Sequence, residues 1–185
     1  MNKKKKKIIS PLEIKYEKLD QYDSNWNEEL LLKKKTDYAF YIWTFLIDFS
    51  YLEHEIDIAL AELINEKNHN FWYVITKDLE TFDKISLFYN SVFPYISFTE
   101  NKKKIEMLDS LIKKLQDITI FRNKIAHWKW NTLDKDGYIR VDAKTSKENG
   151  LIVFRKYKIT LPILRKSIKD MQKLTEEVSN FLFSL

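Results

Sequence analysis

The feature that most constrains the fold is a long run of apolar residues at helical spacing between residues 37 and 66. Residues three and four apart share one face of an α-helix, and this pattern holds for about eight turns. Only two glycines and three prolines occur among 185 residues, too few for a barrel or sandwich rich in tight turns. The sequence therefore predicts a mainly helical fold. The apolar residues form two adjacent stripes, Leu46, Phe49, Ile56, Leu60 and Leu63, and Ile42, Phe45, Leu52 and Ala59.

Three more helical segments are predicted before residue 128. A short helix over residues 28–35 precedes the long one. Residues 81–93 form the next helix, and Pro94 is expected to end it, because proline cannot donate to the helical ladder. A further helix runs from about Asn101 to His127 and has early acidic residues and later lysines, which suits the helix dipole. Its apolar stripe is Leu108, Leu111, Leu115, Ile118 and Ile125.

The pattern changes over residues 138–159, where two short runs of β-type residues flank a polar turn at residues 146–150. This indicates a short β-hairpin. Thr160 then precedes a last helix that opens with Leu161-Pro162 and extends to Phe183, because threonine is a good cap and proline suits the first helical turn. We expect a bundle of four to five helices with the hairpin inserted before the last one.

Residues 1–25 are lysine-rich and predict a mobile N-terminal arm, and residues 26–185 predict one helical domain. The net charge is +5 and the sequence pI about 9.1, which favours a polyanionic partner weakly. Much of the excess lies in Lys3–Lys7, which is either a solvated tail or a non-specific attractor of nucleic-acid phosphates. No signal-peptide core or membrane span is evident, so a cytoplasmic location is expected.

Two charged residues occupy positions that the helical stripes otherwise give to apolar side chains. Glu53 lies in the first stripe of residues 37–66, and Arg122 lies in the stripe of residues 101–127. An ionised group that faces a core costs several kcal/mol unless it is paired or hydrated. We expect Glu53 and Arg122 to lie near each other at a cleft or subunit seam, where the carboxylate holds the guanidinium. The alternative is a structural salt bridge between packed helices.

The residues around Arg122 have side chains suited to phosphate chemistry. Arginine is a permanent cation, and histidine titrates near neutral pH. His127 is about 140° from Arg122 around an ideal helix, whereas Asn123 and His127 share a face. A phosphate between the two faces can contact all three side chains, and the small Ala126 would let a nucleotide approach. The alternative for His127 is a histidine favoured only by the helix C-terminus.

The segment Arg122-Asn123-Lys124-Ile125-Ala126-His127 resembles the HEPN superfamily, whose commonest motif is Arg-Asn-x-x-Ala-His. The resemblance covers about residues 37–185 and includes an acidic residue in an earlier helix, for which Glu53 is the best match. It implies a helical bundle that forms a homodimer, with two motifs facing one cleft. Many members are metal-independent endoribonucleases that act as toxins or antiphage abortive-infection factors. Lys129 stands where toxins paired with nucleotidyltransferase antitoxins have tyrosine.

The hypothesis for catalysis uses the 2′-hydroxyl of RNA as nucleophile, with no cofactor. His127 serves as base or acid, Arg122 neutralises charge on the transition state, and Asn123 orients the phosphate or the imidazole. The products would be a 2′,3′-cyclic phosphate and a 5′-hydroxyl. No metal site is expected, because the chain has no cysteine and its other histidines, His54 and His69, show no metal-ligand spacing.

The residues that follow Arg122 are candidates for RNA contact. Lys124 and Lys129 are cations, and Trp128 and Trp130 flank Lys129, an arrangement that can stack bases. The alternative is that both tryptophans close a core beneath a loop. The hairpin is either a gate over the cleft or an inert cap.

Three functions remain open at this point. The first is an RNA endonuclease of toxin or defence type acting on tRNA, mRNA or rRNA, which the trio Arg122, Asn123 and His127 favours. The second is a non-catalytic module that binds RNA or a nucleotide, or tethers a partner. The third is an antitoxin-like or scaffold subunit of an operon-encoded complex. An antitoxin or defence-operon partner is compatible with each, and no membrane partner is expected.

Overall fold

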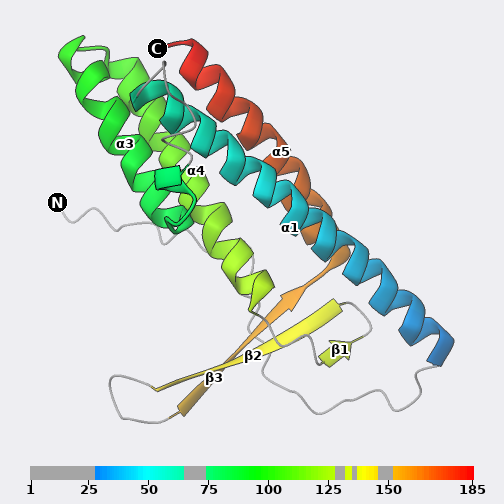
Figure 1. Ribbon diagram of the computed structural model, residues 1–185. Helices are drawn as coiled ribbons and strands as arrows, with labels where there is room; N and C mark the ends of the chain where they lie inside the picture. Colours follow the sequence, from blue (N-terminus) through cyan, green and yellow to red (C-terminus); the bar gives the residue numbers. More distant parts are fainter. Residues whose placement is uncertain (1–27, 65–73, 128–131, 135–136, 146–151) are drawn as a thin grey trace. The chain divides into compact units, whose positions relative to one another are not determined.

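The computed structural model describes residues 28–64, 74–127, 132–134, 137–145 and 152–185 (Figure 1). This part of the chain is mainly helical, and a β-hairpin precedes the last helix, so the predicted fold class is confirmed. The elements in chain order are α1 (Glu28–Ile64), α3 (Thr81–Phe98), α4 (Lys102–Ala126), β1 (Thr132–Asp134), β2 (Gly137–Thr145), β3 (Ile152–Ile159) and α5 (Leu161–Phe183).

The chain divides into two compact units. One comprises residues 1–39 and 128–164, and the other comprises residues 40–127 and 165–185. Helices α1 and α5 each contribute residues to both units. The boundary predicted near residue 25 and the basic arm before it lie outside the described residues.

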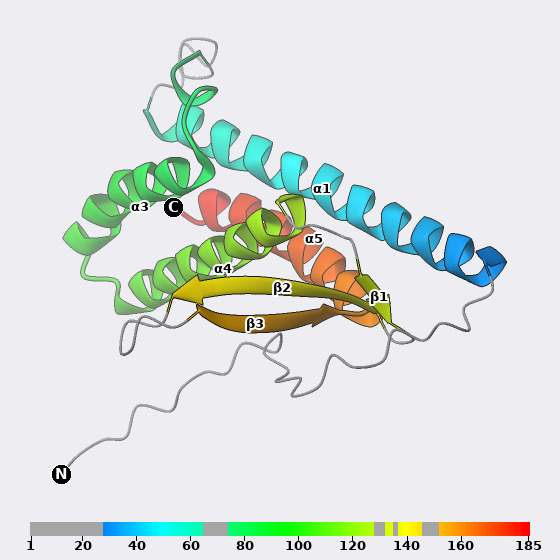
Figure 2. The same ribbon diagram turned by 90° about the horizontal axis from the view of Figure 1, so that it is seen from below.

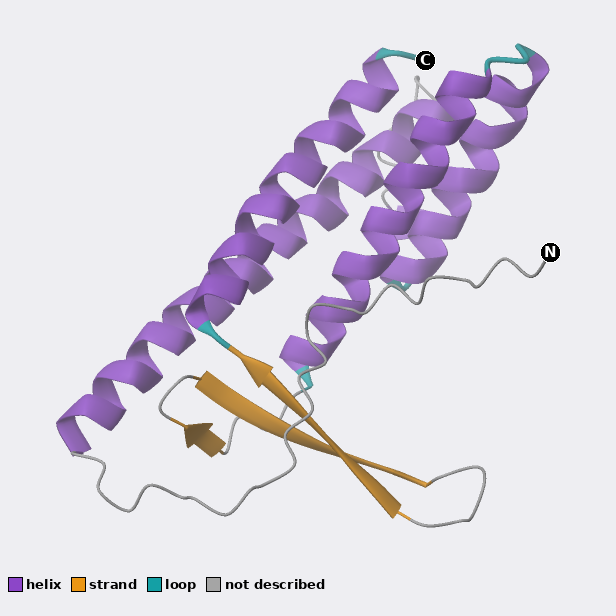
Figure 3. Ribbon diagram, turned by 180° about the vertical axis from the view of Figure 1, so that it is seen from behind, coloured by secondary structure: helices purple, strands orange, loops and turns teal. Residues whose placement is uncertain are grey.

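In the second unit, α3, α4 and most of α1 and α5 run alongside one another as a bundle (Figure 3). The predicted stripes supply its core, because burying apolar side chains is the main driving force of folding. Two ring pairs pack edge to face within it, Phe45 with Phe121 and Phe88 with Phe181. Among the most deeply buried side chains are Phe49, Leu52, Ile56 and Leu60 of α1, Ile85, Val92 and Ile96 of α3, Leu108, Leu115 and Ile125 of α4, and Met171 and Val178 of α5.

In the first unit, the three strands form an antiparallel sheet in the order β1-β2-β3 (Figure 2). Tyr138 of β2 pairs with Ile159 of β3, and Thr145 pairs with Ile152, which sets the register of the predicted hairpin. The Tyr38 side chain is buried, and its hydroxyl donates to the Ile159 carbonyl at 3.1 Å. The turn predicted at residues 146–150 lies outside the described residues.

The predicted division of the first helical region into residues 28–35 and 37–66 is wrong, because α1 is continuous over Glu28–Ile64. Thr36 lies at the expected gap. Its hydroxyl donates to the Leu32 carbonyl at 3.0 Å, the bond that a threonine makes inside a helix. The side chain therefore caps no new helix at this position.

The prediction that Pro94 ends its helix is also wrong, because α3 continues to Phe98. A proline in a helix interior costs about 3 kcal/mol, since it removes one hydrogen bond and crowds the preceding turn. Val92 and Ile96 lie on either side of Pro94, and both are buried. Burial of one large aliphatic side chain contributes roughly 1.5–3 kcal/mol, so core packing offsets the cost of the proline.

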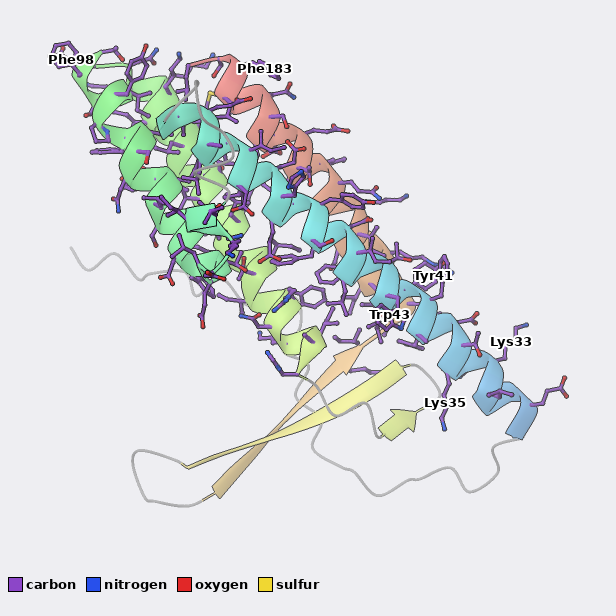
Figure 4. All side chains as sticks on the ribbon, viewed as in Figure 1. Lys33, Lys35, Tyr41, Trp43, Phe98 and Phe183 are labelled. Atoms are coloured by element: carbon purple, nitrogen blue, oxygen red, sulfur yellow. The ribbon has the colours of Figure 1, made fainter. Side chains whose placement is uncertain are left out.

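The outward face of α1 in the second unit is apolar as well. Trp43, labelled in Figure 4, is 66% exposed, and Phe40, Ile47 and Tyr51 at helical spacing from it are also exposed. Phe98 at the end of α3 and Phe183 at the end of α5 are more exposed still (Figure 4). No helix among the described residues has the length and apolar character of a membrane span.

Candidate functional site

One cavity of about 320 Å³ in the second unit gathers four of the residues selected from the sequence. These are Glu53, Arg122, Asn123 and His127. The volume lies at the lower end of the range for small-molecule sites and suits a group of nucleotide size. The remaining lining residues are Leu79, Glu80, Thr81, Phe82 and Thr119.

The last turns of α4 form one side of the cavity. Arg122 lies with its guanidinium carbon 5.4 Å from the centroid of the buried Phe49 ring, a cation–π contact. Its Nη1 donates to Asn123 Oδ1 at 3.1 Å. These two contacts orient the guanidinium while leaving most of its five N–H donors for a ligand.

His127 is the C-terminal cap of α4, and its backbone N–H donates to the Asn123 carbonyl at 3.1 Å. Its side chain is exposed. Thr119, one turn before Arg122, is buried, and its hydroxyl donates to the Leu115 carbonyl at 2.7 Å. The helix end therefore places a solvent-accessible imidazole near the rim and a hydroxyl that is already hydrogen-bonded deeper in the cavity.

Helix α1 and the first turn of α3 form the other side. Glu53 of α1 is half-buried, and its Oε1 accepts a short hydrogen bond from the Thr81 hydroxyl. Glu80 is the N-cap residue of α3 and makes no side-chain capping bond. Phe82, in the first turn of α3, is 36% exposed. This side thus has two carboxylates and one partly exposed aromatic ring.

A second carboxylate of α1, one turn beyond Glu53, is buried. Asp57 is 7% exposed, and its Oδ2 accepts a hydrogen bond and ion pair from Lys84 Nζ at 2.8 Å. Lys84 is 6% exposed. Thr81 and Lys84 are one turn apart on α3, so both polar contacts join the same turn of α3 to α1. Together they hold the first turns of α3, which line the cavity, against α1.

The expected ion pair between Glu53 and Arg122 is wrong as a direct contact. Both side chains line the cavity, but within the described part of the chain no salt bridge joins them. Thr81 contacts the carboxylate and Asn123 contacts the guanidinium, so each charged group has a neutral hydrogen-bond partner instead of the other.

The other candidate RNA-contacting residues are not part of the cavity as described. Lys124 is half-buried and does not line it. Trp128, Lys129 and Trp130 lie outside the described residues.

The contribution of α3 to this site was not predicted from the sequence. Thr81 and Phe82 were assigned only to a predicted helix, and Leu79, Glu80 and Thr119 had no role. The buried pair of Asp57 and Lys84 was missed as well. A charged Lys84 directly before the apolar Ile85 in a predicted helix was the one available signal, because a lysine on an inward face requires a partner.

Among the described residues, no group of three His, Cys, Asp or Glu side chains is placed to hold a metal ion. No protein-family model matches the chain, no curated protein matches it, and no solved structure matches it. The candidate site is therefore defined by its own geometry: one cavity lined by a guanidinium, an accessible imidazole, two carboxylates and an aromatic ring.

Proposed function

We propose that this chain is a metal-independent endoribonuclease that cleaves RNA by attack of the 2′-hydroxyl on the adjacent phosphate. The observation that carries the proposal is the lining of one cavity by Arg122, Asn123 and His127. A guanidinium binds a phosphate through several N–H donors, and an imidazole moves protons near neutral pH. A cavity that combines both suits a reaction at phosphorus.

The proposed reaction balances without a cofactor. A base removes the proton of the 2′-hydroxyl, the oxygen forms a bond to phosphorus, and the bond to the 5′-oxygen breaks. An acid protonates that 5′-oxygen. His127 fills one of the two proton-transfer roles, and Arg122 stabilises the added negative charge in the transition state. The products are a 2′,3′-cyclic phosphate and a 5′-hydroxyl.

We further propose that the chain is a HEPN-type protein that acts as a homodimer. The Arg-Asn-x-x-Ala-His segment at residues 122–127 supports this, together with the helical bundle around it. One protomer supplies one such histidine, and a second copy would supply the other proton-transfer group. Within this proposal the protein is a cytoplasmic toxin or antiphage effector, and an antitoxin or defence-operon partner controls it.

The direct test incubates the purified protein with total RNA and with tRNA in the presence of EDTA. We expect cleavage that leaves 2′,3′-cyclic phosphate ends, and no cleavage of DNA, which lacks the nucleophile. His127→Ala and Arg122→Ala should abolish cleavage. His54→Ala is the matched control for the first, because His54 is exposed on α1 and does not line the cavity; Arg165→Ala is the control for the second.

Full cleavage by His127→Ala or Arg122→Ala would refute the catalytic assignment. A requirement for Mg²⁺ in place of activity in EDTA would refute the metal-free mechanism. If wild type and His127→Ala bind RNA equally but neither cleaves it, the chain is a binding module. Expression in a bacterial host gives an independent readout, in which toxicity of the wild type should vanish with His127→Ala.

A further inference from the structure

The cavity is lined by charges of both signs, which suits more than a phosphate alone. Arg122 and His127 come from the end of α4, and Glu53 and Glu80 come from α1 and the N-cap position of α3. A phosphate alone would bind against Arg122 and be repelled by the two carboxylates. A nucleotide has an anionic phosphate at one end and a neutral base with N–H donors at the other. Its phosphate can pair with the cation while its base donates to a carboxylate.

From this arrangement we propose that Glu53 and Phe82 form a nucleobase subsite that selects guanine next to the cleaved phosphate. The inference rests on the proposed function, because it assumes that RNA is the ligand. Phe82 supplies a partly exposed ring of the kind that stacks on unpaired bases. Glu53 supplies hydrogen-bond acceptors at the edge of the base.

The Glu53 carboxylate is held in place and still has free acceptor capacity. Its Oε1 accepts from the Thr81 hydroxyl, and its Oε2 has no hydrogen-bond partner among the described residues. A carboxylate has about four lone-pair sites, so one bond to Thr81 leaves both oxygens able to accept. The ion pair between Asp57 and Lys84, one turn away, holds α3 and hence Thr81 against α1. The acceptors are therefore held before a ligand arrives.

The acceptor pattern distinguishes guanine from the other bases. Guanine presents two adjacent donors, N1–H and the 2-amino group, to the two oxygens of one carboxylate. Adenine and cytosine each present one amino group beside an acceptor nitrogen, which would face a carboxylate oxygen. Uracil presents one N–H between two carbonyl oxygens. Only guanine makes two hydrogen bonds to Glu53 without bringing two acceptors together.

The test uses DNA oligonucleotides that contain a single ribonucleotide, so that only one position has the 2′-hydroxyl. We expect kcat/KM with guanosine at that position to exceed the values with adenosine, cytidine and uridine by at least about tenfold. Inosine lacks the 2-amino group and should lose most of this advantage. Glu53→Gln should remove the preference for guanosine over inosine, measured as the ratio of kcat/KM for the two substrates within the same variant.

Glu55→Gln is the matched control. Glu55 lies on α1 two residues beyond Glu53, is half-buried, and accepts a hydrogen bond from the Ser179 hydroxyl at 2.9 Å, but it does not line the cavity. Its substitution should leave the base preference intact. Far-UV circular dichroism and thermal unfolding of both variants identify a loss of preference that comes from misfolding.

The outcomes separate this inference from the proposed function. Equal cleavage of all four ribonucleotides, or a guanosine preference that survives in Glu53→Gln, overturns the base subsite and leaves the nuclease standing. If no substrate is cleaved, the nuclease fails, and titration with guanosine 3′-monophosphate and adenosine 3′-monophosphate still tests the subsite. Tighter binding of the guanosine nucleotide that Glu53→Gln abolishes supports it, and equal affinities overturn it.

Discussion

Glu53 and Asp57 stand one turn apart on α1, and the first turns of α3 contact both, yet their environments differ. Asp57 is 7% exposed and pairs with Lys84 at 2.8 Å. Glu53 is half-buried, accepts from the neutral Thr81 hydroxyl, and lines the cavity that also holds Arg122. One carboxylate is paired with a buried cation, and the other lines a cavity without such a partner.

This difference separates a structural charge from one available for function. A buried carboxylate without a cation would destabilise the fold by several kcal/mol, so Asp57 requires Lys84. Glu53 tolerates its charge because water or a ligand can reach it through the cavity. Arg122 behaves likewise, since it packs on Phe49 and contacts Asn123 but forms no salt bridge among the described residues. Two opposite charges without an ion-pair partner among the described residues thus line the same cavity.

The largest effect we predict is on catalysis at the cavity. His127→Ala should lower the rate of RNA cleavage by roughly 10²–10⁴-fold, the usual contribution of a general acid or base. The free energy of unfolding should change little, because the side chain is exposed. Single-turnover cleavage assays and urea denaturation measure the two quantities. A variant that unfolds more easily in proportion to its lost activity would show that the histidine is structural.

The largest effect on stability should come from the buried ion pair of Asp57 and Lys84. Lys84→Met removes the partner of Asp57 and leaves a buried carboxylate unpaired, so the free energy of unfolding should fall by about 3–5 kcal/mol. Urea denaturation followed by circular dichroism measures it. The double variant Asp57→Leu/Lys84→Met should recover most of that loss, since two apolar side chains can replace a buried pair.

A loss below about 1 kcal/mol in Lys84→Met would mean that Asp57 is reached by water. In that case Asp57 and Glu53 would both be hydrated, and their environments would not differ.

Substitution of Glu53 should lower the free energy of unfolding much less than loss of the ion pair between Asp57 and Lys84. Glu53→Ala removes one hydrogen bond at a half-buried position, which contributes about 1 kcal/mol. Thr81→Val should have a similar effect. Because the two groups share one bond, the double variant should destabilise by less than the sum of the single variants. Strict additivity in this double-mutant cycle would contradict the contact.

The smallest effect should come from the surface pair of Lys114 and Glu177. Their side chains are 51% and 46% exposed, and Nζ lies 2.6 Å from Oε2. Exposed pairs of this kind contribute about 0–1 kcal/mol because water and salt screen them. Lys114→Ala should therefore shift the urea midpoint only slightly, and the shift should shrink in 1 M salt. A loss as large as that of Lys84→Met would show that geometry alone, without burial, sets the strength of these pairs.

Most of the helices could be predicted from local sequence patterns. The Asn101 cap of α4 accepts from the Lys104 N–H at 3.1 Å, and the helix ends at His127, as its sequence predicted. The β-hairpin before α5 followed from alternation and turn residues. β1 was missed because a strand of three residues has too little pattern to detect. The Asp136-Gly137 dipeptide in the sequence could have indicated a hairpin at this point, since Asp-Gly is typical of tight hairpin turns.

The two wrong helix boundaries have a common cause. The predicted gap at residue 36 and the predicted end at Pro94 rested on local patterns, but α1 and α3 continue through these positions. Local propensities amount to at most about 3 kcal/mol, and burial of neighbouring side chains contributes as much. Such boundaries depend on packing partners far along the chain, which a local pattern does not contain.

The sequence by itself determined most of the inward positions of α4 and that Arg122, Asn123 and His127 lie together at its end, because positions within about one turn are set by local helix geometry. Only the tertiary structure decided that α3 brings Thr81 to Glu53 and Lys84 to Asp57. Contacts over 27 or 28 residues arise when helices pack, and the pairing of two helix faces leaves no periodic trace in the chain.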